Sequence, residues 1–309
     1  MRTLVCVLGC FVALAASAGP STTDSDGRRV TLKAPAGRVV SLAPHATELL
    51  FAIGAGNRVV GVSEYSDYPA DALRLPRVSS SGGVDLEKVL ALHPDLAVAW
   101  RFEATRGAID RMEKLGIPVF LSEPRHLGDI AQNMDALGTL VGAEAGARAA
   151  SEKFRAMLDG LQRGYAGRAP LKVFYHISMR PLISLNGRTM VSSAIELCGG
   201  VNVLADAPAF APIVDAEAVF AADPDVVVVA QRNPQDSAWQ ANWRERFPAL
   251  RAVREGNLVS VDATIMHRQG PRVLAAVESL CRQLDEVRQR PPRRTDATRS
   301  PPPKADIRR

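Results

Sequence analysis

One segment of this sequence occurs twice, and the repetition constrains the fold more than any other feature. Residues 85–100 read DLEKVLALHPDLAVAW, and residues 215–230 read DAEAVFAADPDVVVVA. The matching pairs include Asp85/Asp215, Glu87/Glu217, Val89/Val219, Pro94/Pro224, Asp95/Asp225 and Val98/Val228. A chance match is the weaker explanation, because these identities all keep the same spacing.

Each copy describes one structural unit. The leading Asp is a helix N-cap, and the Glu two residues later lies in the first turn, where the helix dipole favours negative charge. A Pro-Asp pair then ends the helix, and the apolar run after it suits a strand buried on both faces. Two such units in one chain predict an α/β protein with two similar, Rossmann-like lobes, each with a parallel-type sheet flanked by helices.

The amino terminus predicts export. Arg2 is followed by an uncharged apolar stretch, and Ala16-Ser17-Ala18 matches a signal-peptide cleavage site. We expect residues 1–18 to be removed after about Ala18 and the mature protein to be periplasmic. A lipoprotein cleavage box at residues 7–10 is the weaker alternative, because its apolar run is too short.

The distribution of charge argues against nucleic-acid binding. The chain carries a formal net charge of +5, yet residues 288–309 alone hold eight Arg or Lys and two Asp. The rest of the chain is therefore near neutral and shows no basic face for phosphate. We expect residues 289–309, which are rich in proline and charge, to form a disordered basic tail.

Two of the four cysteines, Cys198 and Cys281, remain after the signal peptide is removed. In an oxidising compartment such a pair favours a disulfide. The bond would close a loop of more than eighty residues and, in the chain-entropy model, stabilise the fold by roughly 4–5 kcal/mol. Two buried thiols are the alternative.

Helix and strand signals alternate with short connections through both halves of the chain. We expect an N-terminal extension at 19–37, a first lobe at 38–143 and a second lobe at 166–288. Residues 144–165 contain no proline and have apolar positions three and four apart, which predicts one long helix joining the lobes. A surface helix of the first lobe is the alternative.

Two further helices are expected inside the lobes. One begins with Thr47 as its cap and runs to Ile53, before Gly54 and Gly56. The other covers residues 193–198 and stops at a Gly-Gly pair. A closing helix is expected at 272–288, where Cys281 can reach back to Cys198.

Ligands of open parallel sheets bind beyond the carboxyl ends of the strands. The side chains at these positions are Tyr65, Tyr68, Trp100, Arg101, His176, Ser178, Gln231, Arg232, Asp262, Thr264 and His267. Aromatic residues make up 5% of the chain, yet several gather here, which indicates a cleft for a large, partly apolar ligand. Purely structural roles are the alternative: Trp100 in the core, Tyr65 and Tyr68 as loop braces, and hydrogen-bonded histidines.

Signatures of catalysis are absent from the sequence. It has no G-x-S-x-G elbow, no H-E-x-x-H helix and no P-loop. The five histidines are scattered and there is no C-x-x-C pair, so neither an enzyme nor a dedicated metal site is expected. A catalytic set assembled from distant residues is the alternative.

Five segments together resemble a known family. They are Arg38–Pro44, Gly61–Pro69, Asp85–Trp100, Leu197–Val203 and Ser279–Leu284. Together they resemble the periplasmic vitamin B12-binding proteins, the substrate-binding components of B12 ABC importers, which are related to helical-backbone receptors for haem and siderophores. The similarity extends from about residue 38 to residue 288, and the SDYP loop and the cysteine pair are its more specific parts.

The resemblance implies roles for individual residues. Tyr65 is expected to pack on the corrin ring and Trp100 to form the cleft wall, while the cysteines form the family's disulfide. Glu87 and Glu217 match two acidic residues that dock onto arginines of the dimeric permease. Duplicated carboxylates on duplicated lobes also suit a partner with twofold symmetry.

The sequence departs from the family at three ring contacts. The Trp expected before Glu87 is replaced by SSSGG at 79–83, a second Trp falls near Ala211 beside Phe210, and an Asp aligns with Thr264. The ligand is therefore expected to be cobalamin, a variant, a cobinamide precursor or another tetrapyrrole. The expected ligand-binding residues are Tyr65, Trp100, His176, Phe210, Thr264 and His267.

The sequence thus predicts an exported, monomeric, non-enzymatic binding protein. It is expected to capture a corrinoid between its lobes and deliver it to an inner-membrane ABC importer, a permease dimer with its ATPase subunits. The alternatives are a haem or ferric-siderophore receptor of the same superfamily, and a hydrolase or chelatase that uses the cleft.

Overall fold

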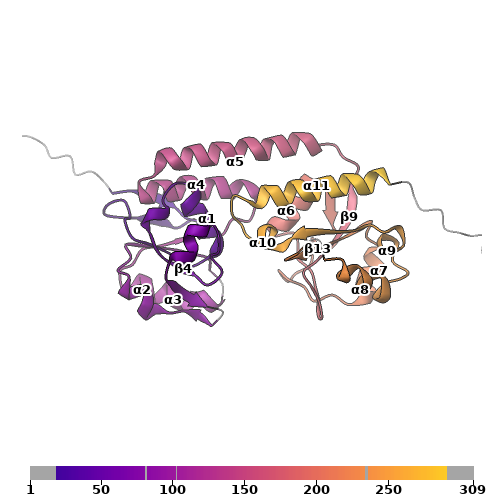
Figure 1. Ribbon diagram of the computed structural model, residues 1–309, viewed down its shortest axis with the longest axis horizontal. Coiled ribbons are helices and arrows are strands. Elements are labelled where there is room, and N and C mark those ends of the chain that lie inside the picture. The colour runs from indigo at the N-terminus through magenta and orange to yellow at the C-terminus, as the bar shows by residue number, and fades with distance from the viewer. Residues whose placement is uncertain (1–18, 81, 102, 234–235, 291–309) are drawn as a thin grey trace, which may run out of the picture.

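The computed structural model describes residues 19–80, 82–101, 103–233 and 236–290. The expected signal peptide and residues 291–309 of the expected tail lie outside this part of the chain. Two lobes lie side by side, and a long helix, α5 (Glu144–Tyr165), runs along one side of both (Figure 1). The predicted α/β class, with two parallel-type sheets flanked by helices, is confirmed.

The first lobe contains a six-stranded sheet. Its strands are β3 (Val39–Ser41), β4 (Val59–Ser63), β5 (Arg77–Ser80), β6 (Gly83–Val84), β7 (Leu96–Ala99) and β8 (Val119–Leu121). Their order is β6-β5-β4-β3-β7-β8, and all neighbours are parallel except β5 and β6. The helices of this lobe are α1 (Pro44–Ala52), α2 (Leu86–Ala91), α3 (Glu103–Lys114) and α4 (Leu127–Val141), with 3-10 turns at Gly56–Arg58 and Ala70–Arg74.

The second lobe contains a four-stranded parallel sheet. Its strands are β9 (Leu171–His176), β12 (Gly200–Asn202), β13 (Val226–Gln231) and β14 (Leu258–Asp262), in the order β12-β9-β13-β14. Its helices are α6 (Met190–Leu197), α7 (Ala216–Ala222), α8 (Ala238–Arg246), α9 (Arg251–Glu255), α10 (Ala263–Met266) and α11 (Val273–Gln289). Two short hairpins, β1 (Ser21–Thr23) with β2 (Arg29–Thr31) and β10 (Ser178–Met179) with β11 (Leu182–Ile183), complete the described fold.

The repeated segment forms the same unit in both lobes, α2 followed by β7 and α7 followed by β13. Asp85 caps α2 by accepting a hydrogen bond from the amide of Lys88 at 3.1 Å, and Asp215 caps α7 from Ala218 at 2.7 Å. The predicted caps are therefore confirmed. The residue before each repeated proline has positive φ, 45° at His93 and 39° at Asp223, so a left-handed residue follows each helix within two positions.

The repeated Asp after each proline fixes strand register. The Asp95 carboxylate accepts the amides of Gly37 and Arg38, both at 2.9 Å, at the start of β3. The Asp225 carboxylate accepts the amide of Lys172 at 2.7 Å, in β9. In each lobe one carboxylate therefore aligns a central strand with its neighbour.

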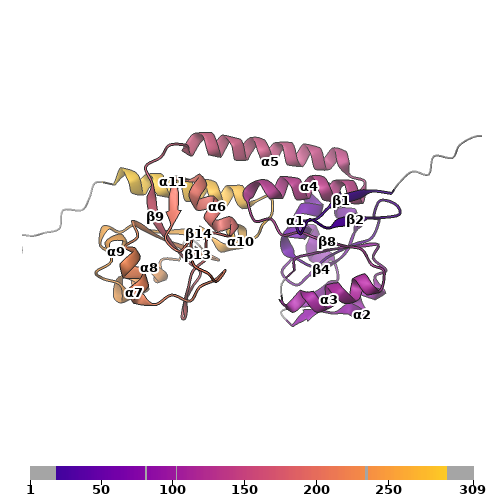
Figure 2. The same ribbon diagram turned by 180° about the vertical axis from the view of Figure 1, so that it is seen from behind.

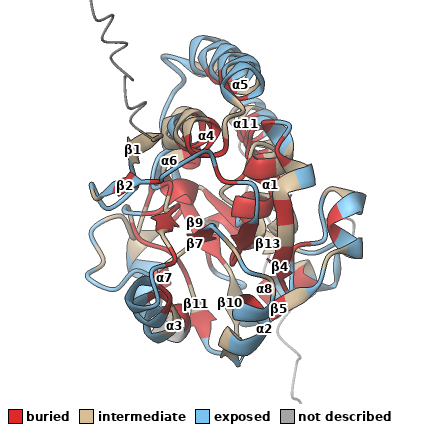
Figure 3. Ribbon diagram, turned by 90° about the vertical axis from the view of Figure 1, so that its left-hand side faces the viewer, coloured by how far each residue is buried: buried red, intermediate tan, exposed pale blue. Residues whose placement is uncertain are grey.

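A continuous apolar core runs through both lobes. It includes residues from β3 and α4 of the first lobe and from β9, α6 and α11 of the second, and α5 covers it with Ala147, Phe154 and Leu158. The opposite face of each sheet has a separate cluster of its own. Figure 3 shows the buried residues along the sheets and on the inner faces of the helices.

Helix α5 packs closely on α4, as both faces of the molecule show (Figures 1 and 2). The approach needs glycine at position 138, because a Cβ there would lie 2.2 Å from the Cβ of Ala147. The lobes are thus joined by a covalent helix and also by shared apolar packing.

Two helices begin earlier than the sequence predicted. Helix α1 starts at Pro44 rather than after Thr47, because proline at the first helical position has a fitting φ and needs no amide partner. The hydroxyl of Thr47 instead forms hydrogen bonds with the buried hydroxyls of Ser41 and Ser66, each at 2.8 Å. Helix α6 starts at Met190 because Thr189 caps it.

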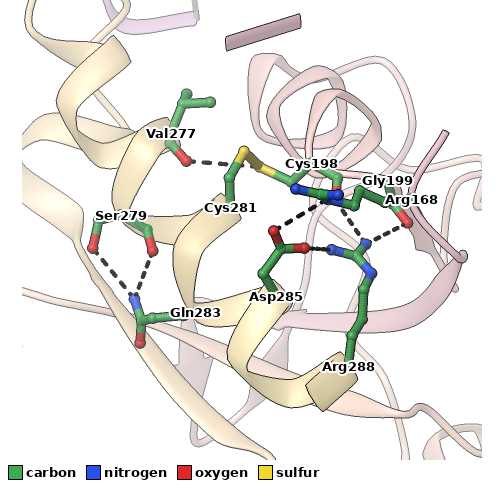
Figure 4. The surroundings of a disulfide bond; sticks show 9 residues. All are labelled: Arg168, Cys198, Gly199, Val277, Ser279, Cys281, Gln283, Asp285 and Arg288. Atoms are coloured by element: carbon green, nitrogen blue, oxygen red, sulfur yellow. Dashed lines mark hydrogen bonds and ion pairs between the residues drawn. A yellow bond between two sulfur atoms is a disulfide. The ribbon is translucent and has the colours of Figure 1, made fainter. Parts of the chain in front are cut away.

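The Cys198–Cys281 disulfide is present, as predicted (Figure 4). It joins the end of α6 to α11 across 83 residues of sequence. Arg288 lies on α11 beyond Cys281, and it donates hydrogen bonds to the carbonyl oxygens of Cys198 at 2.7 Å and Gly199 at 2.9 Å. The closing helix is therefore fastened to α6 by a covalent bond and by an arginine.

Ion pairs and one cation–ring contact connect side chains of the first lobe to arginines of the second lobe. Glu48 of α1 is 3% exposed, and its carboxylate accepts hydrogen bonds from the Nε and Nη2 of Arg272 at 3.0 and 2.5 Å. Arg268 lies 3.6 Å from the same carboxylate and makes a two-point ion pair with Asp67 of the first lobe. The guanidinium of Arg272 also stacks on the ring of Tyr68, 3.8 Å from its centroid. We call these five residues the inter-lobe clamp.

Within the described residues, no helix combines the length and the apolar character needed to cross a bilayer.

The clamp generates a stability prediction. Replacing Arg272 with Met leaves the Glu48 carboxylate buried without its closest cation, so we expect the free energy of unfolding to fall by about 3 kcal/mol. Arg155→Met is the control, because its partner Asp135 is 42% exposed, and a loss below about 1 kcal/mol is expected there. Chemical denaturation measures both. Equal, small losses in the two variants would contradict a buried, inter-lobe role for Glu48.

Candidate ligand-binding cleft

A cleft of about 810 Å³ lies between the lobes, at the carboxyl ends of the strands. The first lobe lines it with residues that follow β7 and β8, and the second lobe with residues that follow β9, precede and begin α6, and end α10. The lining is Trp100, Arg101, Glu123, Pro124, Arg125, His126, Ile177, Leu185, Gly187, Arg188, Thr189, Met190, Val191, Phe210, Met266, His267 and Gln269. The cleft is large enough for a sizeable part of a macrocycle.

Three of the six expected ligand-binding residues line this cleft: Trp100, Phe210 and His267. Trp100 directly follows β7, and the buried ring of His45 meets it edge to face, with the ring centroids 6.4 Å apart. Phe210 is 52% exposed, which leaves its ring available to a ligand. These rings come from both lobes and offer flat apolar surface on opposite walls.

The other three expected residues are not among the cleft lining. Tyr65 is 55% exposed on the loop after β4, and that loop is held by the buried hydroxyl of neighbouring Ser66. His176, at the end of β9, is buried with its ring 5.5 Å from that of Trp243. The hydroxyl of Thr264 donates to the Asp262 carboxylate at 2.6 Å and belongs to the cap of α10.

Several residues that line the cleft were not predicted from the sequence. Glu123, Arg125 and His126 follow β8, and the set of residues predicted from the sequence contains none of them. Arg188 and Thr189 precede α6, whose start was placed three residues too late. The signal that could have identified the first group is their position just beyond the carboxyl end of a parallel strand.

Burial lowers the pKa of three histidines in and around the cleft, His45, His176 and His267. His45 donates from Nε2 to the carbonyl oxygen of Ser122 at 2.9 Å, and burial lowers its pKa to about 4. Burial likewise lowers the pKa of His176 to about 4. Burial also lowers the pKa of His267, whose Nε2 lies 3.0 Å from the hydroxyl of Tyr175. At neutral pH these three histidines therefore carry no positive charge, and His45 and His267 act as hydrogen-bonding groups.

Within the described residues, no group of three or more His, Cys, Asp and Glu side chains is arranged to hold a metal ion.

The two expected docking residues lie outside the cleft. Glu87 and Glu217 are exposed in the first turns of α2 and α7, on the side of the molecule away from α5 (Figure 1). A partly exposed apolar side chain follows each Glu by three residues, Leu90 at 37% and Phe220 at 40% exposure. Each lobe therefore presents a carboxylate beside an apolar side chain on equivalent helices.

Comparison with known proteins agrees with this architecture. Residues 39–264 match the family described as periplasmic binding protein, and the chain belongs to that family. It is a binding protein rather than an enzyme.

Two individual proteins, both named as vitamin B12-binding proteins, are similar to this chain over most of its length. The vitamin B12-binding protein of Yersinia pestis (strain Pestoides F) is 36% identical over 259 residues, which cover 84% of this chain and 90% of the relative. The crystal structure of the periplasmic vitamin B12 binding protein BtuF of Vibrio cholerae superposes with a TM-score of 0.76 at 36% identity, covering 83% of this chain and 99% of BtuF. The resemblance inferred from sequence is therefore confirmed.

A haem-binding relative is more distant. A periplasmic haem-binding protein from Pseudomonas aeruginosa superposes with a TM-score of 0.69 at 25% identity, covering 80% of this chain and 91% of that protein. Haem receptors therefore share the fold.

The buried histidines generate a prediction for acid stability. An unfolded histidine titrates near pH 6.5, whereas His45 and His176 titrate at about 4 in the fold. Between these values the unfolded chain binds more protons, so the free energy of unfolding falls as the pH drops below about 6.5. For each histidine the loss is complete below about pH 4 and amounts to about 3 kcal/mol.

Denaturation at a series of pH values measures this loss, and a His45→Gln variant should lose about half of the two-histidine share. His93→Asn is the control, because His93 is exposed and asparagine tolerates its positive φ. An unchanged pH dependence in His45→Gln would contradict a neutral, buried His45.

Proposed function

We propose that this protein captures cobalamin or a closely related corrinoid in the cleft between its lobes and delivers it to an inner-membrane ABC importer. The single observation that carries this proposal is the 36% identity to vitamin B12-binding proteins over most of the chain, in a fold that places aromatic side chains on both walls of one cleft. Residues 1–18 serve as the export signal, which places the mature protein in the periplasm.

The corrin ring packs against Trp100 from the first lobe and Phe210 from the second. Tyr65, presented by a fixed loop and exposed at its ring, adds a contact at the rim of the cleft. Flat rings suit this ligand because a macrocycle offers a large apolar face and few directional hydrogen bonds. His267 and Thr264 are proposed contacts to the polar periphery, since both lie in or beside the short helix α10. His176 supports the wall from behind.

Haem is the second candidate ligand. A specific observation favours it: His267 lines the cleft, burial favours its neutral form, and its Nε2 is oriented by the Tyr175 hydroxyl. A neutral imidazole held by a second group is the arrangement found at axial ligands of metals.

Docking to the importer uses the equivalent helices α2 and α7. Glu87 and Glu217 each project from a helix that has the same Asp cap, the same buried Val and an exposed apolar residue three positions after the Glu. A partner with twofold symmetry presents the same basic surface twice, so one carboxylate on each lobe can engage it in equivalent ways. The adjacent Leu90 and Phe220 add apolar contact.

The ligand is tested by calorimetry and absorption spectra with cyanocobalamin, cobinamide and haemin in parallel. We expect corrinoid binding that weakens about tenfold in Phe210→Ala and in Tyr65→Ala, because each loses one aromatic contact. Ile213→Ala is the control, since Ile213 is 72% exposed and outside the cleft lining. Binding of haemin alone, with a Soret band that changes in His267→Ala, would replace the corrinoid by haem.

Docking is tested separately with the double variant Glu87→Ala/Glu217→Ala. We expect ligand affinity to stay within about twofold, while importer-dependent uptake slows about tenfold at low salt, because exposed charges act mainly on association. Glu152→Ala on α5, an exposed carboxylate on the opposite side, should leave uptake unchanged. A collapse of ligand affinity in the double variant would assign these glutamates to folding or to the cleft.

A further inference from the structure

Three arginines line a cleft that is otherwise largely apolar. Arg101 and Arg125 come from the first lobe and Arg188 from the second, while the lining holds one carboxylate, Glu123. A bound macrocycle that excludes water from the cleft would strengthen the field of these cations. Their balance of partners therefore decides which substituents the cleft accepts.

The first lobe's arginines are largely balanced by carboxylates. Arg101 lies 3.3 Å from Asp26, and Arg125 lies 3.3 Å from Glu123. Arg101 still has a buried Nε–H without a hydrogen-bond acceptor among the described residues. The first lobe thus contributes one unused donor and little net charge.

Arg188 differs from both. Its Nη2 donates to the carbonyl oxygen of Pro208 at 2.6 Å, and within the described part of the chain it forms no ion pair with a carboxylate. A carbonyl dipole orients the guanidinium without neutralising it. Arg188 is exposed, so its remaining N–H donors are accessible from the cleft.

Arg188 and Arg125 also occupy equivalent places. Each is the residue just before the N-cap of a helix that begins at the cleft, α6 after Thr189 and α4 after His126. A cation from each lobe therefore stands at the cleft rim, while Phe210, Leu185 and Met190 form apolar surface beside them.

We propose that Arg188 binds an anionic substituent of the bound macrocycle, with Arg125 facing it from the other lobe. The substituent is a phosphodiester or a carboxylate, since both offer two oxygens to a guanidinium fork. The ring stacks on the aromatic walls, and the anion fixes its orientation at the rim. This inference deepens the proposed function and rests on it.

The test is a cycle between one protein substitution and one ligand group. Wild type and Arg188→Gln are titrated calorimetrically with cyanocobalamin, which carries a phosphodiester, and with cobinamide, which lacks it. We expect the substitution to weaken cyanocobalamin binding about tenfold or more and to leave cobinamide within about twofold, because a charge-assisted hydrogen bond is lost only with the anion. Cobyrinic acid, whose side chains are free carboxylates, provides the carboxylate arm.

Two further variants sharpen the cycle. Arg188→Lys keeps the charge and should retain part of the discrimination, while losing the two-point geometry. Arg254→Gln removes an exposed arginine of the same lobe, on α9 and outside the cleft lining, and should change nothing. Added salt should weaken binding of the anionic ligands to wild type and have little effect on their binding to Arg188→Gln.

The outcomes separate the two proposals. A loss confined to cobyrinic acid assigns Arg188 to a carboxylate, and a loss confined to cyanocobalamin assigns it to the phosphodiester. Equal losses for all three ligands, or none, overturn the anionic subsite while corrinoid binding stands. Failure of wild type to bind any corrinoid overturns the proposed function and, with it, this inference.

Discussion

The buried carboxylate of Glu48 is the constraint on which the arrangement of the lobes depends. It lies on a helix of the first lobe, and its closest cation belongs to the second, so neither lobe satisfies it alone. The charge is nearly inaccessible to water, and separating the lobes would leave it unpaired at a cost of several kcal/mol. The same segment that supplies Arg268 and Arg272 also places His267 and Gln269 in the cleft. The clamp thus sets the distance between the cleft walls.

Much of the fold could be predicted because the same short-range sequence signals occur in both lobes. The capping Asp, the Glu beside it and the Pro-Asp pair each act within a few residues, so their spacing alone indicates a helix, a turn and a buried strand. The structure adds why Asp95 and Asp225 recur: each carboxylate accepts a backbone amide at or just before the start of the neighbouring strand. That role joins residues more than fifty positions apart, which a local pattern does not reveal.

The site was predictable in part for the same reason. Trp100 directly follows a strand, so topology alone brings it to the cleft. His176 is the last residue of β9, one position earlier than Trp100 relative to its strand, and its ring packs against Trp243, because one position of difference along a strand turns a side chain to the other face. The cationic rim and the clamp depend on contacts between distant residues, 224 positions apart for Glu48 and Arg272. Such pairings follow from tertiary packing and have no signature in the sequence.

The continuous core beneath α5 affects how an importer can distinguish empty from ligand-bound receptors. Because the lobes share apolar packing, the α5 helix and a buried ion pair, we expect the receptor to change its shape little when a ligand binds. With the proposed docking through α2 and α7, the importer would meet empty and ligand-bound receptors with nearly the same surface, so empty receptors would compete for it. The importer must then distinguish filled from empty receptors at the entrance of the cleft, where the bound ligand is exposed, or through its own transport cycle.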